Sequence, residues 1–129
     1  MKTTYRAFTE AYRLCSELQK DPNQPEKFRY ACGRFVAKNK SAAMAHDEKL
    51  MDLRVDHAAT DDSGFFLKEE DGSYRYTKEG FKKLNEAARK LAAEEVQIEP
   101  YLSSDQPKEL PEIQLEILAG FVIDTIKTT

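Results

Sequence analysis

The stretch PEKFRYACGRFVAKNKSAAMAHDEKLMDLRVDH, residues 25–57, decides the fold that we expect. Its apolar and small residues recur at spacings of three, four and seven, which places them on one side of a helix. The members of this stripe are Phe28, Cys32, Phe35, Ala42, Leu50 and Leu53. Pro25 suits a first helical turn, because the N–H that proline lacks would have no intrahelical partner there. The stretch therefore predicts one long amphipathic helix.

The length of this helix is a constraint on the fold. A helix of about 30 residues spans roughly 45 Å at 1.5 Å per residue, which is longer than the diameter expected of a domain of this size. Either the helix bends near residues 39–41, or its far end projects and packs on something else.

A shorter helix is predicted before it, from residue 2 to about residue 20, with Thr3 or Thr4 as the N-cap. Pro22 and Pro25 end this first helix, since proline can neither donate the next hydrogen bond nor leave its predecessor in a helical conformation. The link is short, so the two helices are expected to be antiparallel neighbours.

Asp71-Gly72 predicts a β-hairpin after the long helix. Asp-Gly is favoured in a type I′ turn, where both central residues need positive φ. In that register Glu69 pairs with Tyr74, and Leu67 with Tyr76. One face of the hairpin then carries four apolar side chains, namely Phe65, Leu67, Tyr74 and Tyr76. A lone hairpin is marginal in water, so this face should lie on the helices or on a partner.

The rest of the chain predicts a third helix, a strand and an arm. Thr77 is a good N-cap for a helix over residues 78–94, and residues 96–102 alternate like a strand that we expect beside the hairpin. Residues 103–109 read as a linker before a short helix over residues 111–119. A compact apolar group at this end is expected to dock on its own fold or on a partner: Leu115, Leu118, Phe121 and Val122.

The expected fold is therefore mostly helical α+β. It comprises an antiparallel helix pair, a β-hairpin within a small antiparallel sheet, a third helix and a C-terminal arm. We expect a single domain over residues 1–102, followed by a linker and arm over residues 103–129.

Residue patterns that specify a chemistry are missing from the sequence. It has no phosphate-binding glycine loop and no Glu-plus-His zinc motif, so we expect neither an enzyme nor a cofactor. Cys15 and Cys32 fall on helical stripes and are expected as free core thiols. His46 and His57 lie eleven residues apart, too far to share one metal on a straight helix. Four residues near the helix end are candidate ligands for a divalent cation, but a solvated acidic loop explains them as well and no metal site is expected there: Asp56, His57, Asp61 and Asp62.

A basic segment with one exposed ring is the alternative for nucleic-acid binding. Its candidate contacts, through phosphates and ring stacking, are Lys27, Tyr30, Arg34 and Lys38. Without nucleic-acid binding, the same basic segment would be an ordinary solvated helix face or a surface that binds an acidic protein.

Two motifs carry a resemblance to a protein family. They are Phe81-Lys82-Lys83-Leu84-Asn85-Glu86 with the later Glu94-Glu95-Val96-Gln97-Ile98-Glu99, and Leu110-Pro111-Glu112-Ile113-Gln114-Leu115-Glu116-Ile117-Leu118. With the order of helices and hairpin, these resemble an uncharacterised family of small tailed-phage proteins over residues 28–124. The chain departs from the family at Ala42-Ala43-Met44-Ala45, where a longer charged helix is usual. The resemblance implies a phage origin and a non-enzymatic role.

The function expected is protein–protein contact by a small bacteriophage protein, as a virion structural or assembly component. The partner would be a second copy or another phage protein. One alternative is an accessory inhibitor that binds a host defence or nucleic-acid-processing protein through the acidic C-terminal region; nucleic-acid binding is the other. The N-terminus lacks the apolar region of a secretory signal and no apolar run is long enough to span a membrane. We therefore expect the host bacterial cytoplasm, with incorporation in the virion under the assembly reading, and no membrane contact.

Overall fold

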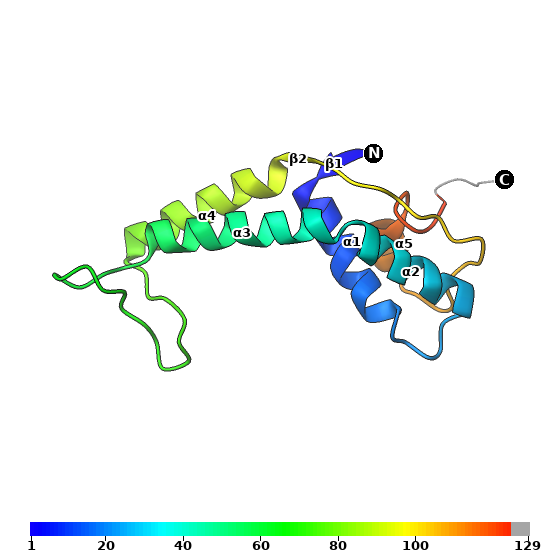
Figure 1. The fold of residues 1–129 in the computed structure, drawn as a ribbon, viewed down its shortest axis with the longest axis horizontal. Coiled ribbons are helices and arrows are strands. Elements are labelled where there is room, and N and C mark those ends of the chain that lie inside the picture. The colour runs from blue at the N-terminus through cyan, green and yellow to red at the C-terminus, as the bar shows by residue number, and fades with distance from the viewer. Residues whose placement is uncertain (125–129) are drawn as a thin grey trace. The chain divides into compact units, whose positions relative to one another are not determined.

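The computed structural model describes residues 1–124, and over these the chain is a mostly helical α+β protein. Figure 1 shows the order of the elements. The helices are α1 (Tyr5–Leu18), α2 (Glu26–Lys38), α3 (Lys40–His57), α4 (Lys78–Ala93) and α5 (Glu112–Leu118). The strands β1 (Lys2–Thr4) and β2 (Glu95–Gln97) form an antiparallel pair, in which Thr3 lies opposite Val96. The fold class is as predicted from the sequence.

The chain divides into two compact units. Within the described residues, unit 1 comprises residues 1–44 and 95–124, whereas unit 2 comprises residues 45–94. The structure thus divides the chain differently from the expected boundary at residue 102, and the expected C-terminal arm belongs to unit 1. Unit 2 is an insertion between the two halves of unit 1.

Apolar side chains of α1, α2 and the C-terminal segment form the core of unit 1. Phe8, Phe28 and Phe35 are fully buried, and the Phe35 ring contacts that of Phe121 edge-on with 5.7 Å between centroids. Thr4 caps α1, accepting a hydrogen bond from the Ala7 N–H. This end of the predicted long stripe is therefore a core face, as its spacing indicated.

The predicted long helix ends at Asn39. The backbone there leaves the helical region, with φ −112° and ψ 15°, so α2 and α3 are separate helices. The bend is one of the two outcomes that the length of the helix allowed. The second half of the stripe differs from the prediction, because no residue of α3 is fully buried and Leu50 and Leu53 are half-buried. The apolar residues of α3 are spread around the helix, so they define no single core face.

Two buried amide side chains bind an extended segment to the ends of α2. The Asn39 amide donates to the Glu99 carbonyl (2.7 Å) and accepts from the Glu99 N–H (2.8 Å). Gln24 makes the same pair of bonds with the backbone of Lys108, at 2.9 and 2.7 Å. Each amide thus satisfies both backbone groups of one residue in a segment that forms no helix or strand there. These bonds hold residues 99–108 along α2.

The apolar group predicted at the C-terminal end lies in the core of unit 1. Leu118 and Val122 are fully buried, Phe121 is 5% exposed and Leu115 is half-buried. The Tyr101 and Ser103 N–H groups donate to the carbonyls of Phe121 and Val122, both at 2.8 Å. Leu118, Phe121 and Val122 therefore pack on their own fold, which is one of the two alternatives expected from the sequence, and they do not form an exposed partner surface.

The prediction that residues 96–102 join the hairpin is wrong. β2 pairs with β1 instead, and the Ile98 N–H donates to the Met1 carbonyl. A strand tendency is visible in a sequence, but its pairing partner is a long-range contact that the alternation does not specify.

Replacement of Asn39 by Ala is expected to destabilise unit 1 by about 1–3 kcal/mol, because it removes the partner of the partly buried N–H and carbonyl groups of Glu99. Urea denaturation followed by circular dichroism measures this. The exposed Asn85 of α4 gives a matched control, and Asn85→Ala should change the free energy of unfolding by less than about 0.5 kcal/mol. Equal effects of the two substitutions would contradict this role of Asn39.

The same measurement tests the C-terminal packing. Leu118→Ala should cost about 2–5 kcal/mol, since it opens a cavity at a fully buried site. Ile113 lies on the same helix and is 67% exposed, so Ile113→Ala should cost little. A small effect of Leu118→Ala would indicate that α5 is not part of the folded core.

Candidate partner-binding surfaces

Unit 2 is built on two antiparallel helices. Residues 45–57 of α3 and all of α4 run side by side (Figure 1), with the Lys49 ammonium 3.7 Å from the Glu94 carboxylate at one end. At the other end Gly80 lies so close to α3 that a Cβ there would be 3.0 Å from the His57 carbonyl oxygen. Thr77 caps α4 as predicted, accepting from the Gly80 N–H. Leu84 and Leu91 are the only apolar residues of this unit that are buried.

Two hairpins, each with a three-residue loop, connect these helices. In the second, the Gly72 N–H donates to the Glu69 carbonyl and the Glu69 N–H donates to the Ser73 carbonyl. Gly72 has φ +87°, which makes this a type I turn followed by a left-handed glycine. Asp61 and Gly64 make the equivalent turn eight residues earlier.

The register of the second hairpin differs from the prediction by one residue. Lys68, rather than Glu69, lies opposite Tyr74, because the loop has three residues instead of two. A shift of one residue moves side chains to the other face, so Tyr74 joins Phe66 and Lys68. The Phe66 and Tyr74 rings are 4.8 Å apart, and the Lys68 ammonium lies 5.7 Å from the Tyr74 ring centroid. The predicted face of Phe65, Leu67, Tyr74 and Tyr76 is therefore wrong.

Three strand-like segments close on each other at the base of these hairpins. The Ala59 N–H donates to Arg75, the Arg75 N–H to Leu67, and the Leu67 N–H to Ala59, with N···O distances of 2.8–3.0 Å. This ring of backbone bonds holds the loop without a buried apolar core, so its side chains remain outside. Phe65 is 71% exposed, and Phe66 and Leu67 are also exposed.

A groove in unit 2 lies between the hairpin and the helices, with a volume of about 660 Å³. Its apolar lining comes from Met51 of α3, from Phe81 and Leu84 of α4, and from Tyr74 and Tyr76. The Tyr76 and Phe81 rings are 6.1 Å apart. Arg54 and Lys68 also line the groove, which has no carboxylate among its lining residues. We call this the unit 2 groove.

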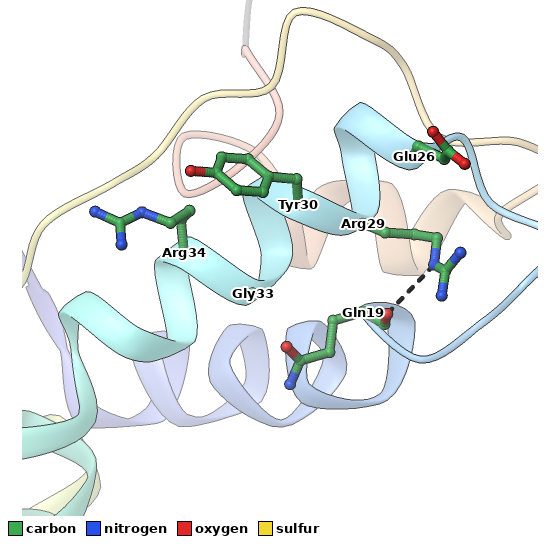
Figure 2. Close-up of a pocket in the computed structure, with 6 residues that line it drawn as sticks. All are labelled: Gln19, Glu26, Arg29, Tyr30, Gly33 and Arg34. Carbon is green, nitrogen blue, oxygen red and sulfur yellow. Dashed lines mark hydrogen bonds between the residues drawn. The ribbon is translucent and has the colours of Figure 1, made fainter.

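A shallower pocket in unit 1, of about 440 Å³, contains part of the predicted nucleic-acid surface (Figure 2). Tyr30 and Arg34 both line it, whereas Lys27 does not, and Lys38 pairs with Glu99 at 3.5 Å. Figure 2 shows the Arg29 guanidinium turned away from Arg34, towards the Gln19 carbonyl oxygen, which accepts from Arg29 Nε at 3.3 Å. The four predicted contacts thus do not form one cluster.

The cysteine and histidine side chains form no reactive or metal-binding site within residues 1–124. Cys15 and Cys32 are free and buried. A hydrogen bond with the Cys32 thiol, together with burial, raises the pKa of the Cys15 thiol, so this sulfur stays protonated. The His57 ring nitrogen Nδ1 lies 2.9 Å from the Leu53 carbonyl oxygen of its own helix. Within residues 1–124, no three His, Cys, Asp or Glu side chains converge in a metal-binding arrangement.

Comparison with known proteins leaves these surfaces without a counterpart: no protein-family model, no curated protein and no solved structure matches the chain. No helix in the described part of the chain is long and apolar enough to cross a membrane.

The turn that presents Ser73 and Tyr74 to the groove has a measurable acid dependence. Hydrogen bonds from the Ser73 hydroxyl (2.6 Å) and N–H (3.0 Å) lower the pKa of Asp71 below its ordinary value. A lowered folded-state pKa stabilises the turn above the unfolded-state pKa, and this contribution is lost as the pH falls through the folded-state pKa. An NMR titration should show the pKa of Asp71 rising in Ser73→Ala and unchanged in Ser63→Ala. An unaltered pKa in Ser73→Ala would rule out the bond.

Proposed function

We propose that this protein acts by binding other proteins, as a virion structural or assembly component of a bacteriophage. One observation carries the protein-binding part: unit 2 buries two large apolar side chains and exposes six. The exposed ones are Met51, Val55, Phe65, Phe66, Leu67 and Phe81. Three of them are consecutive in the hairpin. Exposed apolar side chains that gather on one unit are typical of protein-interaction sites.

The magnitudes favour this role. Full burial of a Phe or Leu side chain is worth about 1.5–3 kcal/mol, so covering a few of these residues would stabilise a complex substantially. Aromatic anchors of this kind commonly supply most of the binding energy of an interface. The ring of backbone hydrogen bonds at Ala59, Leu67 and Arg75 supports such a role, because it orders the exposed segment before a partner binds.

The phage part of the proposal rests on the resemblance of residues 28–124 to a family of small tailed-phage proteins. A virion or assembly component binds its partners in stoichiometric amounts. An exposed apolar surface is typical of a protein that remains bound in such a complex. Two apolar clusters are predicted from the sequence as binding surfaces, one in the hairpin and one at the C-terminal end. Only the hairpin remains a candidate surface, because the C-terminal cluster packs in the core of unit 1.

The test is the protein's recovery in purified particles. In phage that carry Phe65→Ser with Phe66→Ser, incorporation should fall at least about tenfold, because both rings lie outside the folded core. Quantitative mass spectrometry of the particles and of their assembly intermediates measures this. Ile113→Ser removes an apolar side chain of unit 1 that is 67% exposed, close to the 71% of Phe65, and should leave incorporation unchanged. Absence of the wild-type protein from particles and intermediates alike would overturn the proposed function.

A further inference from the structure

We infer that the unit 2 groove binds a short segment of a partner protein in which a carboxylate stands beside a large apolar side chain. This inference rests on the proposed function and names the class of partner. The segment's apolar side chain would lie over Leu84, between Met51 and Phe81, and its carboxylate would bind Arg54 and Lys68.

The first argument is the composition of the groove walls. Three apolar side chains of the helices line the groove: Leu84 is 8% exposed, whereas Met51 and Phe81 are 47% and 52% exposed. Aromatic rings from the hairpin, those of Tyr74 and Tyr76, provide further apolar lining. Concave sites of roughly 300–1,000 Å³ lined by apolar and aromatic side chains are typical ligand-binding pockets. Methionine adds a side chain that adapts to different bound groups.

The second argument is charge. Arg54 and Lys68 line the groove without a carboxylate beside them, and neither takes part in a salt bridge within residues 1–124. Glu69, the nearest acidic residue in sequence to Lys68, pairs instead with Arg75 at 3.3 Å. The groove therefore has two positive groups beside an apolar lining, and a partner carboxylate complements both features. The hydroxyl groups of Tyr74 and Tyr76 are further donors for the same oxygens, whereas the Ser73 hydroxyl already donates to Asp71.

The charge of the whole unit favours a peptide over a nucleic acid. Residues 45–94 contain twelve acidic and nine basic residues, so a phosphate backbone extending beyond the groove would meet net negative charge. A short segment with one or two carboxylates needs only the two local cations.

The experiment is a selection of peptides against the full chain. A displayed library of random peptides should yield sequences in which Asp or Glu lies within two positions of Phe, Tyr, Leu or Met. Synthetic peptides from the selection are then titrated by fluorescence anisotropy. Arg54→Glu with Lys68→Glu should weaken their binding at least about tenfold, and added salt should weaken it for the wild type.

The control variant is Lys82→Glu with Lys90→Glu. It makes the same change in net charge on exposed residues of unit 2 that do not line the groove. It should change peptide affinity by less than about twofold. Phe81→Ala tests the apolar part of the groove, and it should weaken binding while circular dichroism stays unchanged, because Phe81 lies half outside the fold.

Four results would overturn the inference. The selection could yield no peptide, or only peptides without a carboxylate. The groove variant and the control variant could lose the same peptide affinity, or an oligothymidylate probe could bind through Arg54 and Lys68 while the peptides do not. Light scattering adds a fifth, self-association abolished by the groove variant, which would make a second copy the occupant. If Phe65→Ser with Phe66→Ser prevents incorporation into particles and the groove variant does not, the groove inference fails and the proposed function stands. If the wild type never enters particles but the selected peptides bind as expected, the proposed function fails and the groove inference stands.

Discussion

The structure of unit 1 depends on two side-chain amides that pair with backbone. Gln24 and Asn39 flank α2, and each binds both polar groups of one residue in the segment that returns beside it. A buried peptide group without a partner costs free energy, and residues 99–108 lie in neither a helix nor a strand. The amides therefore allow an irregular segment to lie against a helix. They also fix where the C-terminal residues begin, and thereby bring Phe121 onto Phe35.

Unit 2 is stabilised differently from unit 1. Its loop is ordered mainly by backbone hydrogen bonds and by two left-handed glycines, Gly64 and Gly72, and its helices bury only two large apolar side chains. A segment ordered in this way can keep aromatic side chains outside, because its conformation does not depend on burying them. The same property distinguishes a binding surface from an exposed but misfolded apolar segment.

The sequence was sufficient for features that depend on neighbours along the chain. The caps at Thr4 and Thr77 and the helical stripe through Phe28 and Phe35 are local, and each was predicted. Features that depend on distant partners were not. Glu95–Gln97 has a strand pattern, but nothing local states that Lys2–Thr4 is its partner. The hairpin register failed for a related reason, since Asp-Gly is compatible with both two-residue and three-residue loops. The groove combines two helices with that hairpin, so its residues could not be grouped in advance.

The insertion of unit 2 has a consequence for synthesis of the protein. α1 and α2 leave the ribosome before unit 2, yet the residues that complete their core begin only at position 95. At about 5–20 residues per second, the fifty residues of unit 2 separate the two halves by roughly 3–10 s. During that interval Phe35 lacks Phe121, and Gln24 and Asn39 lack their backbone partners. The nascent N-terminal helices are therefore exposed to chaperones and to premature aggregation, whereas the continuous unit 2 can fold as soon as α4 has emerged.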